Sequence, residues 1–199
     1  MAFSLDETQK LESLGTPLII TFPNQLNLTD KINITIHYET TENSAAVQWL
    51  TPEMTLGKKY PFMFTQCEAI LCRTLLPCQD SPAVKVLVSS ALTVKKPLTA
   101  LYAGIKTKQP VSNGEFITFY YEIKTRIPTY LIAIAAGALE TRNIGPRTNV
   151  WAEKELVDAS AWEFKETESF IQTVNNLIYI HLYFLLRIVN FYILFSIKF

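Results

Sequence analysis

Short apolar segments separated by turn residues run from Pro17 to about Trp151, and no long part of this region repeats with the period of a helix. Apolar and polar residues alternate most clearly between Lys31 and Tyr38, as a strand with one buried face requires. The apolar members of this alternation are Ile32, Ile34, Ile36 and Tyr38. His37 falls on the polar face, and we interpret it as a solvated strand residue and not as a catalytic base. The region therefore predicts an all-β domain.

Five other segments have the composition of strands and are bounded by turn residues. They are Leu18–Phe22, Ala45–Leu50, Val84–Ser89, Glu115–Lys124 and Tyr130–Ala136. The predicted turns lie at Pro23–Asn24, Pro110–Gly114 and Asn143–Pro146. The run from Leu131 to Leu139 is almost entirely apolar, which predicts a strand buried on both faces.

The period of the apolar residues changes after Trp151 and predicts a short helix. Phe170, Ile171, Val174 and Leu177 share one helical face. They follow the acidic stretch from Glu163 to Glu168, and carboxylates favour the first turn of a helix.

The charge balance excludes a nucleic-acid-binding protein, and the histidine content excludes a self-contained zinc hydrolase of the H-E-x-x-H type. The chain has 18 basic and 18 acidic residues, so it lacks the excess of positive charge that binds phosphates, and no nucleic-acid partner is expected. Its two histidines, His37 and His181, lie 144 positions apart, so no H-E-x-x-H zinc motif is present. The amino terminus, MAFSLDETQKLE, carries acidic residues where a secretory signal has a basic start and an apolar run, which predicts a cytoplasmic location.

Three cysteines, Cys67, Cys72 and Cys78, have the spacing C-x4-C-x5-C. This spacing is neither that of a zinc ribbon nor that of a C-x-x-C redox pair. An odd number of cysteines without a secretory signal predicts reduced thiols. We interpret them as packing residues, with redox sensitivity as the alternative.

The last 22 residues, 178–199, differ from the rest of the chain, because 17 are apolar and only Arg187 and Lys198 are charged. Their length matches a membrane span of about 20 residues, but an arginine near the middle costs about 3 kcal/mol. Such a span would be a tail anchor. The alternative is translated non-coding sequence, because 18 of the 22 residues belong to the types encoded by codons of A and T alone. The composition favours this second interpretation.

The most specific motifs lie between Gln48 and Pro82. They are QWLTPE, then F-x-Q-C-E-A, then C-R-x-x-x-P-C-x-D-x-P. In this order they resemble the N-terminal domain of the zinc aminopeptidases of the aminopeptidase N family, and most closely the leukotriene A(4) hydrolase / aminopeptidase branch. Further similar segments follow in order at 127–133 (I-P-x-Y-L-I-A), 137–140 (GALE), 144–148 (IGPRT) and 150–155 (V-W-x-E-K-E). The resemblance covers nearly all of the chain from Leu18 to Leu177.

The resemblance implies a fold and a division into domains. Residues 1–152 would form the family's N-terminal β-domain, a β-sandwich or saddle, incomplete at its start. Residues 153–177 would begin the helical catalytic domain, and residues 178–199 would be a hydrophobic tail unlike the family.

The resemblance also implies two substrate-binding residues. In the family the Q-x-E loop reaches over the zinc domain, and the position that matches Glu68 helps to bind the amino terminus of the substrate. Gln66 would line the same pocket. The leukotriene hydrolase branch usually has glutamine where this chain has Glu68, and the wider aminopeptidase family has glutamate. This difference favours peptide binding over epoxide hydrolysis. A solvated loop carboxylate is the alternative interpretation of Glu68.

Other residues of the motifs are expected to be structural. Arg73 and Asp80 would stabilise the turn from Pro77 to Pro82, although an acid/base or ion-binding pair is the alternative. The aromatic residues Trp49, Tyr130 and Trp151 would lie in the core or at a domain interface.

The first functional hypothesis is a truncated zinc aminopeptidase of the leukotriene hydrolase type. The family's zinc motif and transition-state tyrosine belong to a catalytic domain, and neither that motif nor the G-x-M-E-N strand occurs here. We therefore expect no catalytic residue, no zinc site and no peptide hydrolysis in this chain alone. Its expected partners are the missing catalytic domain and, in the complete enzyme, peptide amino termini. The alternative is a non-enzymatic binding module held on a membrane by residues 178–199.

Overall fold

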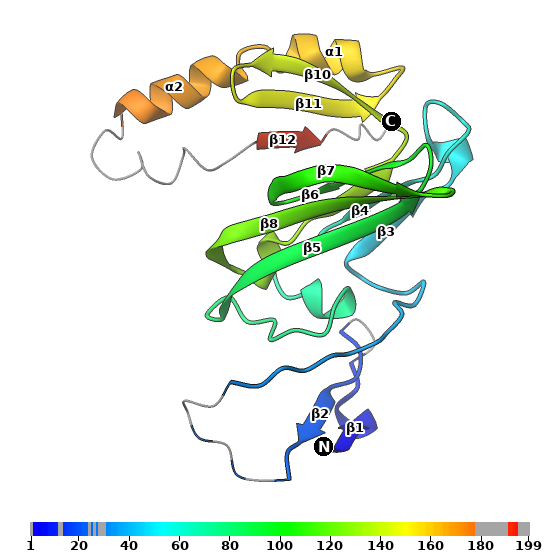
Figure 1. Ribbon diagram of the computed structural model, residues 1–199, viewed down its shortest axis with the longest axis vertical. Helices are drawn as coiled ribbons and strands as arrows, with labels where there is room; N and C mark the ends of the chain where they lie inside the picture. The colour runs from blue at the N-terminus through cyan, green and yellow to red at the C-terminus, as the bar shows by residue number, and fades with distance from the viewer. Residues whose placement is uncertain are drawn as a thin grey trace.

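A computed structural model gives the fold of the chain, and it describes residues 2–11, 14–23, 25, 27, 31–177 and 191–194. Most of the regular structure is β-sheet, as the sequence predicts (Figure 1). The amino-terminal strands β1 (Ala2–Leu5) and β2 (Leu18–Thr21) pair with each other as a separate antiparallel ribbon. A short 3-10 turn, Glu7–Gln9, follows β1.

Two sheets form the centre of the molecule. The first has the order β3-β4-β9-β6, from β3 (Val47–Leu50), β4 (Phe62–Thr65), β9 (Ile134–Gly137) and β6 (Thr99–Tyr102). The second has the order β5-β8-β7, from β5 (Lys85–Lys95), β8 (Phe116–Pro128) and β7 (Ile105–Asn113). All neighbouring strands in both sheets are antiparallel.

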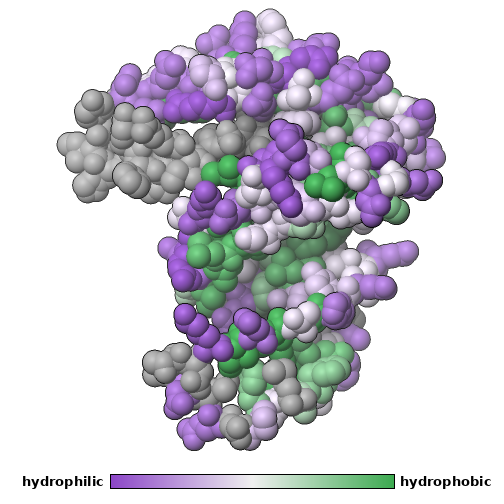
Figure 2. Space-filling view, in the orientation of Figure 1, coloured by the Kyte–Doolittle hydropathy of each residue, from purple (hydrophilic) through white to green (hydrophobic). Residues whose placement is uncertain are grey.

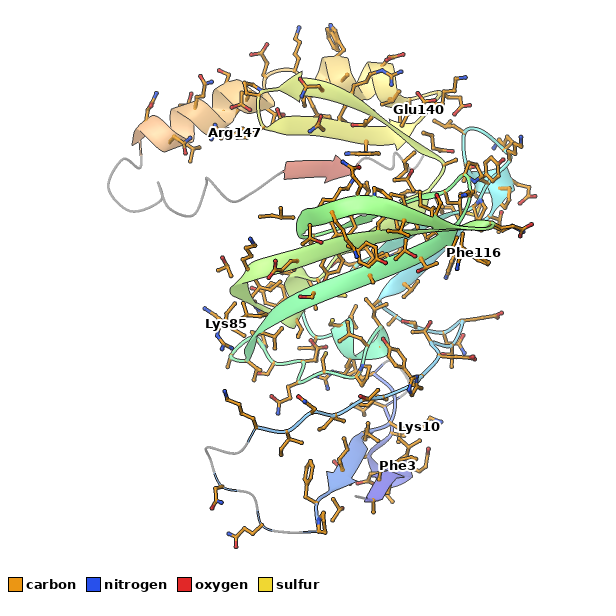
Figure 3. All side chains as sticks on the ribbon, in the orientation of Figure 1. Phe3, Lys10, Lys85, Phe116, Glu140 and Arg147 are labelled. Atoms are coloured by element: carbon orange, nitrogen blue, oxygen red, sulfur yellow. The ribbon has the colours of Figure 1, made fainter. Side chains whose placement is uncertain are left out.

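A third layer lies beyond these sheets, in yellow and orange in Figure 1. It contains the hairpin of β10 (Leu139–Gly145) and β11 (Thr148–Glu153), with helices α1 (Val157–Glu163) and α2 (Thr167–Leu177) beside it. Strand β12 (Phe191–Leu194) pairs parallel to β11. Figure 3 labels Arg147 in the turn of this hairpin, and its Nε donates to Glu168 Oε1 of α2 over 2.9 Å. This partly buried ion pair holds α2 against the hairpin.

The alternation of residues in β6 and β9 divides the interior into two cores. Ala100 and Tyr102 point to the sheet β5-β8-β7, where they join one buried cluster with Tyr121 of β8. Leu101 of β6 and Ala135 of β9 point to the opposite face and join a second cluster, which reaches the third layer. Because β9 is covered on both sides, it contains small residues at adjacent positions. The prediction of a strand buried on both faces is confirmed for this element, although Leu131 is exposed.

The predicted strands at Leu18–Phe22, Ala45–Leu50, Val84–Ser89 and Glu115–Lys124 are confirmed as β2, β3, β5 and β8. The segment Tyr130–Ala136 is confirmed only in its second half. Its first residues belong to a 3-10 turn, Thr129–Leu131, and β9 begins at Ile134. Pro128 is the last residue of β8, has an extended backbone and directly precedes this turn.

The segment from Lys31 to Tyr38 was predicted as the clearest strand, and this prediction is wrong. The structure assigns it no strand, and its four apolar side chains remain 37% to 53% exposed. A strand exists only when a neighbour accepts and donates its backbone hydrogen bonds. The described residues offer this segment no such neighbour. Its exposure does agree with the interpretation of His37 as a solvated residue.

The turn predicted at Pro110–Gly114 is wrong at its start, because Pro110 lies within β7. This edge strand departs from regular pairing between Lys108 and Val111. A bulge at a sheet edge tolerates a residue without a backbone N–H, so the proline does not end the strand. The turn itself contains Gly114, which has a positive φ of 56°.

The predicted helix is confirmed as α2, and a separate helix, α1, precedes it in the chain. Its predicted apolar face is not buried within the described part of the chain, since Phe170 is 67% exposed and Val174 40%. Most of the tail at 178–199 lies outside the described residues. No helix among the described residues is long and apolar enough to span a membrane.

Gly137 at the end of β9 allows a close approach by the ring of Phe62 on the neighbouring strand β4. A Cβ at this position would lie 2.5 Å from Phe62 Cδ2, well inside van der Waals contact. We expect Gly137→Ala to lower the free energy of unfolding by about 1–3 kcal/mol, as overpacking does. Urea denaturation followed by circular dichroism measures this change.

Gly57→Ala is the matched control, because a Cβ there meets its nearest atom, in Glu155, at an ordinary 3.5 Å. Equal stabilities for the two variants would contradict the predicted clash at Gly137.

Candidate functional site

The loop that follows β4 carries both residues that the sequence predicts to bind substrate. It is held at its start by two hydrogen bonds: Gln66 N–H donates to the carbonyl of Ala46 over 2.8 Å, and Ile134 N–H donates to Thr65 Oγ1 over 2.9 Å. The neighbouring strands therefore fix where the loop leaves the sheet.

Gln66 and Glu68 lie close together on this loop. The backbone N–H of Glu68 donates to Gln66 Oε1 over 3.0 Å, and both side chains are exposed. Cys67 between them points the opposite way and is only 1% exposed. Its carbonyl accepts a hydrogen bond from Leu71 N–H at 2.9 Å. A buried thiol thus anchors a loop whose polar side chains face outward.

The carboxylate of Glu68 has no hydrogen bond or ion pair with any other described residue. The side chain is exposed on the protein surface. Such a group can accept a charge-assisted hydrogen bond from an ammonium ion. The structure thus brings the two predicted residues together on one loop, and their role in binding substrate stays a prediction.

Asp80 organises the segment that follows the loop. Its Oδ2 accepts from the backbone N–H of Arg73 at 2.9 Å and from Arg73 Nε at 3.4 Å, and Arg73 Nη2 donates to the Asp80 carbonyl at 2.9 Å. Its Oδ1 accepts from Thr129 Oγ1 at 2.6 Å. The interpretation of Arg73 and Asp80 as structural residues is confirmed. Thr129 is not predicted from the sequence, because a partner 49 residues away leaves no local signal.

Cys67 of the loop and the nearby Cys72 and Cys78 are free thiols, and Cys67 and Cys72 are buried as a packing role predicts. Hydrogen bonds to Cys67 and Cys78, together with burial, raise the pKa of the Cys72 thiol far above its usual value. Hydrogen bonding with Cys72 lowers the pKa of Cys67 and of Cys78. Cys72 therefore interacts with both of the other thiols.

The described residues contain one group of potential metal ligands, and it does not fit a catalytic zinc centre. The donor atoms of Cys72, Cys78 and Asp80 lie within 4.8 Å of one another. Both oxygens of Asp80 already accept hydrogen bonds, and the group contains no histidine. A catalytic zinc needs three protein ligands and an open position for water.

The three aromatic residues of the motifs have different environments. Trp151 of β11 packs against the second core, as predicted, and its buried indole N–H has no hydrogen-bond partner among the described residues. Tyr130 is half-buried. Trp49 is 62% exposed on the edge strand β3, so it does not lie in the core, and its place at a domain interface stays a prediction. An edge strand packed on one side leaves alternate side chains in solvent.

The chain is similar to known proteins over most of its length. A family model described as the peptidase M1 N-terminal domain matches residues 2–131, so the match begins before Leu18, where the motifs begin to resemble the family. A leukotriene A-4 hydrolase from Xenopus laevis is 41% identical over 179 residues, which are 88% of this chain and 29% of that protein. A leucine aminopeptidase 2 from Coccidioides immitis (strain RS) is 39% identical over 175 residues, or 85% of this chain and 28% of the relative.

The fold of the chain is also similar to that of a solved structure. The solved structure of native yeast LTA4 hydrolase superposes with a TM-score of 0.72 at 35% identity, covering 88% of this chain and 26% of the other. The chain thus spans less than a third of the length of the curated relatives that it matches.

Proposed function

We propose a function on the premise that this chain belongs to the peptidase M1 family of zinc metallopeptidases and contains its N-terminal domain. The domain would help to recognise the amino terminus of a peptide substrate. Glu68 would bind the α-ammonium group, and Gln66 would position Glu68 and line the same pocket. Peptide hydrolysis would be the reaction of the complete protein.

The observation that carries the proposal is the exposed carboxylate of Glu68, on a residue whose backbone N–H donates to Gln66 Oε1 over 3.0 Å. A carboxylate discriminates between a free amino terminus and an acylated one, because only the free amine carries a positive charge and several N–H donors. Glutamate at this position supports peptide binding more than a neutral side chain would. The name leucine aminopeptidase 2 of one relative agrees with a peptide substrate.

The catalytic chemistry of this proposal requires groups outside these 199 residues. The sequence contains no H-E-x-x-H motif, and the described residues do not fit a catalytic zinc centre. A catalytic domain would therefore hold the zinc, and the β-domain would contribute to binding and orientation of the substrate.

A binding experiment tests the role of Glu68. In NMR titrations of the ¹⁵N-labelled chain, we expect Leu-Gly-Gly to shift the amide signals of Gln66 and Glu68, and N-acetyl-Leu-Gly-Gly to leave them unchanged. We expect Glu68→Gln to weaken binding of the free peptide by about tenfold or more, because a hydrogen bond to a charged group contributes about 1.5–3 kcal/mol.

Glu163→Gln provides the matched control, because Glu163 is an exposed carboxylate at the end of α1 in the third layer. It should bind the peptide as the unmodified chain does. Equal shifts with the free and the acetylated peptide, or equal losses in the two variants, would contradict the proposal.

The cytoplasmic location also remains a proposal, with the tail-anchored form as its alternative. Carbonate extraction of membranes from cells that express the chain separates the two, because a membrane-spanning tail stays in the pellet. We expect the chain in the supernatant. Recovery in the pellet, with a version lacking residues 178–199 in the supernatant, would establish the tail anchor.

A further inference from the structure

We propose that Cys72 and Cys78 form a site of reversible oxidation by hydroperoxides, in which Cys78 is attacked first and Cys72 then closes a disulfide. The proposal rests on the positions and the unequal exposure of the thiols, and it is independent of the proposed function.

The backbone between the two cysteines brings their sulfur atoms together. Leu75 N–H and Leu76 N–H donate to the carbonyl of Cys72 over 2.9 and 3.0 Å, which folds the segment into a 3-10 turn. Asp80, just after the segment, accepts a hydrogen bond from the backbone N–H of Arg73 at its beginning. Cys72 Sγ, Cys78 Sγ and an Asp80 oxygen consequently lie within 4.8 Å of one another.

The two thiols differ in their access to solvent. Cys72 has no exposed surface, whereas Cys78 is half-buried and can meet a small oxidant. Hydrogen bonding with Cys72 lowers the pKa of the Cys78 thiol, against the opposing effects of burial and of the Asp80 carboxylate. A thiolate is the nucleophilic form of cysteine, so Cys78 is both the more accessible and the more reactive of the pair.

The reaction is balanced by one hydroperoxide. The Cys78 thiol attacks the outer peroxide oxygen, the O–O bond breaks, and the alcohol leaves with the thiol proton, which gives Cys78 sulfenic acid. The Cys72 sulfur then attacks the Cys78 sulfur, an S–S bond forms and water leaves. Two thiols have together lost two electrons, and the hydroperoxide has been reduced to alcohol and water.

Metal binding is less well supported by the same geometry. Both carboxylate oxygens of Asp80 accept hydrogen bonds. Cys67 contacts Cys72 but does not join the group of mutually close donors among the described residues. Two thiols without further free ligands are suited to a disulfide and not to a four-coordinate metal.

The oxidation is tested on the full chain with hydrogen peroxide. Thiol titration after denaturation should find three thiols before treatment and one afterwards, with full recovery on adding dithiothreitol. Trypsin cuts after Arg73, so Cys67 and Cys72 fall in one peptide and Cys78 in the next. The expected disulfide therefore links two tryptic peptides, and fragmentation of the linked pair should place the bond on Cys72.

Two controls separate the proposal from non-specific oxidation. Cys67→Ser should retain the linked peptides, and Cys72→Ser should lose them and leave a sulfenic acid on Cys78 that dimedone captures. The chain unfolded in urea should form the bond at least about tenfold more slowly, because the fold no longer holds the thiols together.

Three results would overturn the proposal. They are retention of all three thiols after peroxide treatment, a bond between Cys67 and Cys72 within one peptide, and equal rates in the folded and unfolded chain. Because the assignment by fragmentation uses the unmodified protein, it stands even if a variant fails to fold.

Discussion

Replacing Tyr121 with alanine should lower the free energy of unfolding by about 3–5 kcal/mol, which is the cost of removing a large buried aromatic side chain. Tyr121 lies between the two central sheets and is only 2% exposed. Its ring packs against Tyr102 with 5.9 Å between the ring centroids. Its hydroxyl donates to the carbonyl of Ala100 over 2.7 Å, on the edge strand β6. The substitution therefore creates a cavity and leaves a buried carbonyl without its donor.

Urea denaturation of three variants separates these contributions. Tyr121→Phe keeps the ring and loses only the hydrogen bond, so it should cost about 1 kcal/mol. Tyr120→Ala is the matched control, because Tyr120 is adjacent in sequence but lies on the opposite face of β8, where Lys108 covers its ring. A loss for Tyr121→Ala no greater than that for Tyr120→Ala would contradict the assignment of this core.

Replacing Asp80 with alanine should cost about 3 kcal/mol, since breaking a buried charged network leaves its partners unsatisfied. The side chain of Asp80 is 1% exposed and accepts hydrogen bonds from Arg73 and Thr129. Without it the buried Thr129 hydroxyl has no acceptor at this position, and the turn that contains Cys78 is no longer fastened to Cys72. The midpoint of urea unfolding measures the loss.

Glu115→Ala is the control for Asp80→Ala. Glu115 forms an ion pair with Lys95 at 3.1 Å, but both side chains are largely exposed. Exposed ion pairs contribute at most about 1 kcal/mol. The loss of free energy of unfolding for Asp80→Asn should lie between the losses for Asp80→Ala and Glu115→Ala. The asparagine amide retains an oxygen for Thr129 but lacks the charge beside Arg73. Equal losses for Asp80→Ala and Glu115→Ala would show that burial of Asp80 does not matter.

The surface of the chain differs between its layers. Figure 2 shows apolar residues gathered over the central sheets, while the layer that contains α1 and α2 is mostly hydrophilic on this face. Several large apolar side chains remain exposed, including Trp49, Leu87 and Phe116. The division at 1–152, 153–177 and 178–199 stays a prediction, although the change from strands to helices after β11 agrees with a boundary near residue 153.

Regular alternation allowed the longer strands to be predicted, because β5 and β8 pair with each other over most of their length and bury one face. The alternation from Lys31 to Tyr38 is equally regular, yet it forms no strand. A sequence pattern records which face of a segment is apolar, but it does not record whether a neighbouring strand is available. Strand β9 was hard to delimit for a related reason, since small apolar residues continue on both sides of it.

The short apolar segments and their alternation determined the β-rich fold. The order of the motifs determined the family and the two candidate residues Gln66 and Glu68, because these depend on residue types at fixed spacings. Only the tertiary structure decided how these residues are held. It placed Thr129 against Asp80, brought the sulfur atoms of Cys72 and Cys78 within 4.8 Å of each other, and left Phe170 of α2 exposed. Contacts of this kind join segments far apart in the chain, so they depend on how the sheets and loops pack together and not on any local pattern.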